Sequence, residues 1–143
     1  MSNDAKPTRV SLLPVLRYSD CTAALRFLTE VFGFTEGMSF RDDAGKVVHA
    51  ELWFGNGGMM IGPVADTPFG KFMRQPGEAG GVTASLFLVV SDPDTHHARS
   101  QAAGFEILLP LRDEPYGSRE YSVRDPEGHI WTFGTYDAAA NKA

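Results

Sequence analysis

Cysteine is almost absent from this chain, since Cys21 is the only one among 143 residues. A single cysteine cannot form a disulfide within the chain, and nothing in the composition indicates an oxidising compartment. The first ten residues are polar and lack the apolar core of a secretory signal peptide. We therefore expect a cytoplasmic protein.

Long apolar runs and excess positive charge are also missing. The longest stretch without a charged residue, 52–65, is too short and too rich in glycine to span a bilayer. The chain has 13 Lys and Arg against 18 Asp and Glu, a net charge of −5. Phosphate backbones are bound by basic surfaces, so we expect neither a nucleic-acid nor a membrane partner. The acidic balance suits a cationic small ligand, although it is also ordinary for a soluble protein.

What the chain does contain is one pattern that occurs twice. Each copy has an apolar, β-prone segment, then an aspartate, a helical pattern and a Gly-Phe pair. These parts are Val10–Leu16, Asp20 and Gly33-Phe34 in the first copy, and Val82–Val90, Asp92 and Gly104-Phe105 in the second. The aspartates are suited to cap the first turn of a helix, and the glycines to end it in a left-handed conformation.

Three further β-prone segments follow each helical pattern, separated by Gly, Asp, Asn and Pro residues that favour turns. They are Glu36–Arg41, Val47–Phe54, Met59–Pro63, Phe105–Leu109, Ser118–Arg124 and His129–Thr135. The sequence thus predicts an α+β protein with two tandem β-α-β-β-β modules and eight strands. We expect a single domain over 1–143, with module one at about 9–64, a linker at 65–81, module two at 82–136 and a frayed tail at 137–143.

The run from Tyr116 to His129 resembles the G-R-E-F-x-V-R-D-P-x-G-N run of bleomycin-resistance proteins, with Ser118 inserted, Tyr121 in place of Phe and His129 in place of Asn. The opening Pro14-Val15-Leu16 is also similar to that branch. The chain therefore resembles the vicinal-oxygen-chelate superfamily, which includes glyoxalases, bleomycin-resistance proteins and dioxygenases. The resemblance implies a curved eight-stranded half-barrel around a cavity, and a homodimer.

Metal-dependent members of that superfamily take His, Gln or Glu ligands from the first and last strands of each module. Counting from the shared Asp and Gly landmarks places these positions at Leu13, Ile61, Ser85 and Thr132. None of the four offers the imidazole, thiolate or carboxylate that zinc, nickel or iron needs. A shift of one residue does not restore the set, so we expect no metal and no other cofactor.

The four histidines leave several interpretations open. His96 and His97 lie on the second predicted helix, where solvated side chains are expected, and His129 follows a turn glycine. His49 and Glu51 share one face of a strand with Trp53, because side chains alternate along a strand. That face could hold a two-ligand metal site or an acid/base pair, or it could be an ordinary solvent-exposed face.

Two functions are therefore weighed, besides a regulatory or structural role with no small ligand. The first is a small-molecule-binding protein of the bleomycin-resistance or glyoxalase-like type, which sequesters an aromatic or cationic ligand without a metal. Proteins of this class serve antibiotic resistance. The second is a metal-dependent lyase or oxygenase of the glyoxalase or dioxygenase type, with atypical ligands such as His49 and Glu51. No catalytic residue is assigned. The candidate ligand-binding residues are Trp53, Glu51, His49, Tyr116, Arg119, Tyr121 and Phe40.

Overall fold

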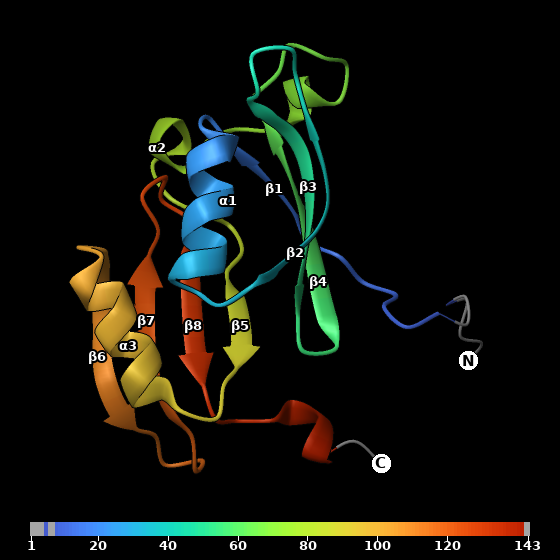
Figure 1. The fold of residues 1–143 in the computed structure, drawn as a ribbon. Helices are drawn as coiled ribbons and strands as arrows, with labels where there is room; N and C mark the ends of the chain where they lie inside the picture. The colour runs from blue at the N-terminus through green and yellow to red at the C-terminus, as the bar shows by residue number, and fades with distance from the viewer. Residues whose placement is uncertain (1–4, 6–7, 142–143) are drawn as a thin grey trace. The chain divides into compact units, whose positions relative to one another are not determined.

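The computed structural model describes Ala5 and residues 8–141. The chain divides into two compact units between Met73 and Arg74, inside the predicted linker (Figure 1). The linker is not plain coil, because it contains the short 3-10 helix η1 (Gly70–Phe72) and the one-turn helix α2 (Pro76–Ala79). In the described part of the chain, no helix is long and apolar enough to cross a membrane.

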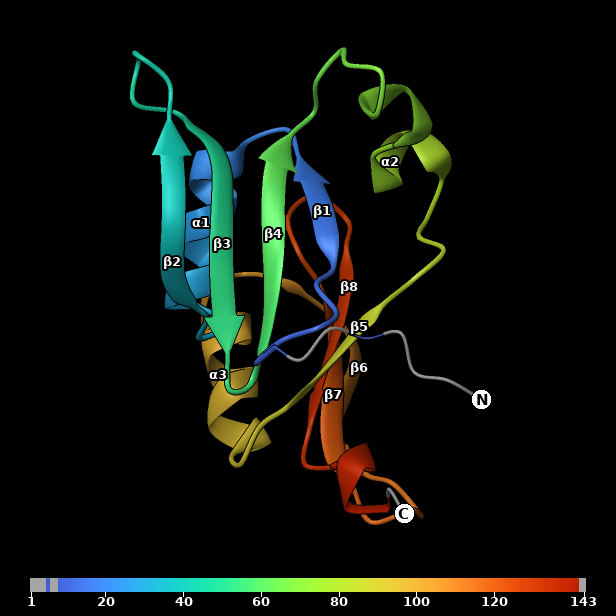
Figure 2. The ribbon, with the colours of Figure 1, turned by 90° about the vertical axis from the view of Figure 1, so that its right-hand side faces the viewer.

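Unit one holds a four-stranded mixed sheet with a helix on one face. Its strands lie in the order β1-β4-β3-β2, with β1 parallel to β4 and the other pairs antiparallel. Figure 2 shows these strands side by side with α1 behind them. The elements are β1 (Val15–Tyr18), α1 (Cys21–Glu30), β2 (Thr35–Arg41), β3 (Val47–Phe54) and β4 (Gly57–Pro63).

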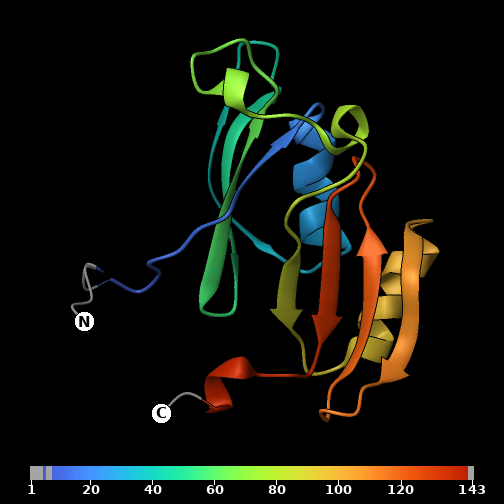
Figure 3. The same ribbon diagram turned by 180° about the vertical axis from the view of Figure 1, so that it is seen from behind.

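Unit two repeats this arrangement, which confirms the predicted α+β class and the doubled β-α-β-β-β order. The strands lie in the order β5-β8-β7-β6, and α3 packs on β6, β7 and β8 (Figure 3). The short 3-10 helix η2 (Ala138–Asn141) lies in the tail that was expected to fray, whose last two residues are outside the described part. The other elements are β5 (Leu86–Val89), α3 (Pro93–Ala102), β6 (Glu106–Asp113), β7 (Arg119–Arg124) and β8 (Ile130–Gly134).

The predicted helix ends are confirmed. The carboxylates of Asp20 and Asp92 accept the amide of the third helical residue at 3.0 and 3.1 Å. Gly33 and Gly104 follow the helices with φ of 91° and 80°, the left-handed region that favours glycine. These local signals fix where each helix begins and ends, and therefore which strand segments it can cover.

The first strands are shorter than the sequence predicts. The segment 10–14 lies outside β1, which begins at Val15, and 82–85 lies outside β5. Pro14 has no amide hydrogen to give to a strand partner, although its carbonyl still accepts the amide of Met60 at 2.9 Å. Apart from this bond, the segment 10–14 therefore lies outside the sheet ladder.

The core of unit one lies between α1 and one face of its sheet. Ala50 pairs with Ile61 and Leu52 with Met59, and all four side chains are buried. α1 contacts both β3 and β4, and its Ala24, Leu25 and Leu28 are buried as well. We call the opposite face of each sheet, away from its own helix, the open face.

The core of unit two contains a buried polar network under α3. The Tyr121 hydroxyl lies 2.5 Å from His96 Nδ1 and 2.8 Å from Ser100 Oγ, both on α3. The His96 ring stacks on Phe133 with centroids 3.9 Å apart. His96 is only 3% exposed, so the expectation of a solvated His96 was wrong: its face of α3 packs on the sheet.

A buried aspartate holds the turn between β7 and β8. Asp125 accepts the amides of Glu127 and His129 at 2.9 and 3.2 Å, and the indole N–H of the buried Trp131 at 3.0 Å. In unit one, Asp42 accepts the amides of Ala44 and Lys46 in a matching turn, but this aspartate is exposed. The two turns therefore share a geometry and differ in burial.

We predict that Asp125→Ala lowers the free energy of unfolding by about 2–3 kcal/mol, because it leaves a buried indole donor without its acceptor. Asp42→Ala is the matched control and should cost at most about 1 kcal/mol, since water can reach the released amides. Urea unfolding followed by circular dichroism measures both. Equal losses in the two variants would contradict the role of burial.

Tyr121→Phe should destabilise the protein by about 1–2 kcal/mol at neutral pH, because buried His96 and Ser100 lose a shared partner. Burial also raises the pKa of Tyr121 to about 12. An unfolded tyrosine ionises near pH 10, so the neutral phenol contributes its full stability below about pH 10 and loses it as the pH rises toward 12. In alkaline urea titrations, the variant should therefore lose less stability across this range than the wild type; an identical decline would contradict this assignment.

Candidate functional site

Four of the seven predicted ligand residues come together on the open face of unit one. His49, Glu51 and Trp53 alternate along β3 with the buried residues that face α1. Phe40 on β2 pairs with His49, and the two rings lie 5.9 Å apart. Phe40 is 53% exposed and Trp53 37% exposed. The predicted common face of the β3 residues is therefore present, and it carries accessible aromatic surface.

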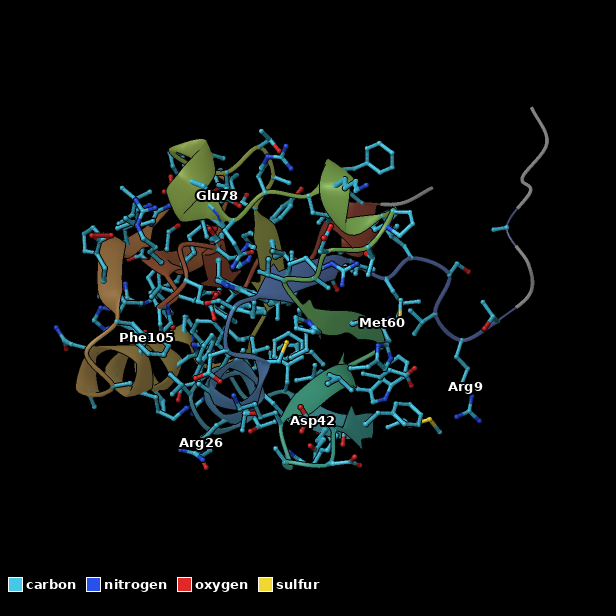
Figure 4. All side chains as sticks on the ribbon, turned by 90° about the horizontal axis from the view of Figure 1, so that it is seen from above. Arg9, Arg26, Asp42, Met60, Glu78 and Phe105 are labelled. Carbon is cyan, nitrogen blue, oxygen red and sulfur yellow. The ribbon has the colours of Figure 1, made fainter. Side chains whose placement is uncertain are left out.

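The two ionisable groups of this face contact each other. His49 Nε2 lies 3.3 Å from Glu51 Oε2, and about a third of each side chain is exposed. Met60, labelled in Figure 4, pairs with Glu51 from β4 and supplies an apolar neighbour. Glu51 brings a carboxylate to this face, which suits a positively charged ligand group.

A hollow of about 690 Å³ lies beside the indole of Trp53. Its other walls come from the segment before β1 and from the β3–β4 turn; Figure 4 labels Arg9 on that first segment. Such a volume falls in the range of small-molecule pockets. The lining residues are Thr8, Arg9, Val10, Leu13, Trp53, Gly55 and Asn56.

In unit two, Tyr116 belongs to a cluster around a buried carboxylate. Glu120, only 4% exposed, accepts hydrogen bonds from the Tyr116 hydroxyl and from Ser118 Oγ, both at 2.7 Å. Arg112 adds an ion pair at 3.2 Å. The hydrogen bond to Glu120 raises the pKa of Tyr116 to about 12. Tyr116 is thus a neutral donor that is held in place by Glu120, while its ring is 56% exposed.

The other two candidates, Arg119 and Tyr121, face α3 instead of the open face. Arg119 binds both carboxylate oxygens of Asp94 on α3, at 2.7 and 3.0 Å, and also pairs with Asp113. Hydrogen bonding to Asp94 raises the pKa of Arg119 further. Tyr121 has no exposed surface. The expectation that both residues bind a ligand stays a prediction, and the candidate site is built on the residues of the open face.

The open face of unit two is apolar around a hydroxyl pair. Ser122 and Thr132 hydrogen bond to each other at 2.8 Å. Phe87 pairs with Thr132 and Leu109 with Ser122, and both apolar side chains are close to half exposed. This face offers contact area and neutral polar groups.

The positions that would hold a metal in related proteins carry no suitable donors. Ile61 is buried on the side that faces α1, which corrects its assignment to the cavity, and its neighbours Met60 and Gly62 are no substitute. Thr132 is bonded to Ser122, and its partner across β5 is Phe87 rather than Ser85. Within Ala5 and residues 8–141, no group of three or more His, Cys, Asp or Glu side chains is placed to hold an ion. The residues present do not fit a divalent metal.

Sequence reasoning missed three features of the open faces: Glu120, Phe87 and the glycines under the indole of Trp53. Glu120 follows directly from strand alternation, because it lies next to the buried Tyr121 on β7. Gly37 and Gly58 lie inside strands, a position that often marks a close approach by another group. Phe87 lies inside the predicted segment Val82–Val90, but this run is apolar throughout and so does not show which of its faces the helix covers.

The comparisons with known proteins agree with this architecture. TioX from Micromonospora sp. ML1 is 36% identical over 86% of this chain and 97% of its own, with a TM-score of 0.65. An uncharacterized protein of Mycobacterium tuberculosis is 29% identical over 124 residues, 87% of this chain and 73% of the relative.

The fosfomycin resistance protein FosX from Listeria monocytogenes covers 89% of this chain and 93% of its own, at a TM-score of 0.66. At 15% identity, that likeness shows the fold alone. One FosX structure is a complex with Mn(II) and sulfate ion. The model of the Glyoxalase/Bleomycin resistance protein/Dioxygenase superfamily matches residues 11–133. This chain belongs to that superfamily.

Proposed function

We propose that this protein binds and sequesters a planar aromatic or cationic small molecule, without a metal and without catalysing a reaction. The observation that carries the proposal is the exposed indole of Trp53 at the edge of a hollow, on the same strand face as Glu51. Indole faces bind planar rings and cations. Phe40 and His49 extend this face toward β2.

The charges around the site support a positively charged ligand. Glu51 lies two residues from Trp53 on the same face, and the net charge of −5 attracts cations over distance. Arg9 in the wall of the hollow opposes this preference. Arg9 lines the hollow and Glu51 does not. We therefore propose that the positive charge of the ligand lies outside the hollow, next to Glu51 on the open face.

Metal-dependent catalysis is the weaker candidate. His49 and Glu51 together provide two donors, whereas catalytic zinc sites use three protein ligands. The superfamily supports many chemistries, so membership alone does not favour an enzyme. The single, buried Cys21 fits the cytoplasmic location that is part of this proposal.

Titration with the cationic ligands bleomycin and proflavine, followed by calorimetry and tryptophan fluorescence, tests the proposal. Trp53→Ala should weaken binding by about threefold to thirtyfold, the value of one lost stacking contact. Glu51→Gln should weaken it by about threefold to tenfold, and Arg9→Gln should strengthen it. Dialysis against EDTA should leave the affinity unchanged.

Two controls keep these results specific. Glu36→Gln removes the same charge from β2 at a position paired with the buried Leu52, away from the open face. Phe72→Ala removes an exposed aromatic ring from η1, outside the sheet. The proposal fails if neither ligand binds at millimolar concentration, or if EDTA abolishes binding.

We also propose a homodimer. Each sheet ends in edge strands, β1 and β2 in unit one and β5 and β6 in unit two, and exposed edges favour pairing with another chain. Two-fold pairing is the commonest arrangement for such chains. Light scattering at micromolar concentration should report twice the chain mass of 15.6 kDa; a value of one chain mass would contradict the dimer.

A further inference from the structure

The indole of Trp53 lies across two glycines on the strands that flank β3. A Cβ atom on Gly37 of β2 would stand 2.5 Å from Nε1 of the indole and 3.1 Å from Cδ1. A Cβ atom on Gly58 of β4 would stand 2.5 Å from Cζ3 and nearer still to Cε3. These atoms belong to opposite edges of the ring. The indole therefore lies between the two glycines, with one edge at Gly37 of β2 and the opposite edge at Gly58 of β4.

Backbone conformation does not explain either glycine. Eight glycines of the described chain have positive φ, and Gly37 and Gly58 are not among them. Glycine inside a strand costs stability, because it loses more conformational freedom on folding and packs no side chain. What the two positions require is the absence of a Cβ, since real Cβ atoms do not approach other atoms to 2.5 Å. Any side chain there would lift one edge of the indole.

The placement of the indole between the two glycines bears on which surface of Trp53 a ligand meets. Its two edges are close to Gly37 and Gly58, and the side chain remains 37% exposed. The hollow beside it is bounded by Val10 and Leu13, and among the described residues its lining has no aromatic ring besides Trp53. A ligand that enters the hollow therefore has the indole as its aromatic contact.

We infer that Gly37 and Gly58 are positioning residues that set Trp53 as a flat stacking platform, and that this platform selects planar fused-ring cations over puckered cations of equal charge. The inference rests on the proposed function, of which it names the ligand class. A flat ring gains contact with the whole indole face, whereas a puckered ring touches it at a few atoms. Selection by shape thus adds to the attraction by Glu51, which both kinds of cation share.

The experiment compares Gly58→Ala with Gly57→Ala, two adjacent substitutions on β4. A Cβ on Gly57 would meet only the Phe54 carbonyl at 3.5 Å, an ordinary contact. The probes are proflavine, a planar fused-ring cation, and cyclohexylammonium, a puckered one, each titrated by calorimetry. Wild-type protein should prefer proflavine. Gly58→Ala should weaken proflavine binding by about threefold to thirtyfold and leave cyclohexylammonium within about twofold. Gly57→Ala should change neither.

A readout without ligand separates this inference from the proposed function. Gly58→Ala should increase acrylamide quenching of Trp53 and Gly57→Ala should not, because only the former displaces the indole. If Gly58→Ala does not fold by circular dichroism, Gly37→Ala tests the same point from the other edge of the ring. Failure of the wild type to bind either probe overturns the proposed function. Unchanged proflavine affinity and unchanged quenching in folded Gly58→Ala overturn the inference alone.

Discussion

The helix packed on one face of each sheet is the constraint on which the candidate site depends. Side chains alternate along a strand, so covering one face with α1 or α3 assigns every second residue to the core. On β3 this assignment buries Ala50 and Leu52, and it leaves Glu51 and Trp53 on the open face. A shift of one residue in the register of β3 would exchange its buried residues with those on the open face. Core packing and ligand access are thus two consequences of one contact.

The helices could be predicted from sequence because their signals are local. An aspartate cap and a left-handed glycine act within one helix, and both were found in both units at Asp20, Gly33, Asp92 and Gly104. The β-α-β-β-β order follows from these ends and from the turn residues between strands. The start of β1 depends on pairing with β4, which is distant in sequence, and so the prediction at Val10 was five residues early.

For the site, the sequence predicted only which residues of a strand share a face, because that follows from the alternation of side chains. Alternation groups His49, Glu51 and Trp53 correctly, but it does not say which group the helix covers. Tyr121 and Ile61 were assigned to the cavity side, whereas both are buried in their units. In contrast, the choice of face on β3 agreed with exposure. Ala50 and Leu52 are apolar, whereas the residues that alternate with them, His49, Glu51 and Trp53, include polar side chains. The sequence alone gives no reason for glycine at Gly37 and Gly58, because that reason is their contact with the indole of Trp53.

We propose that ligands bind at the open face of unit one, on the exposed indole of Trp53. The two tryptophans allow a direct test by NMR, because Trp53 is exposed and Trp131 is buried with its indole N–H bonded to Asp125. During titration with proflavine, the indole N–H resonance of Trp53 should shift in a saturable way, while that of Trp131 should remain in place. Shifts confined to unit two, with the Trp53 resonance unmoved at saturation, would contradict the account.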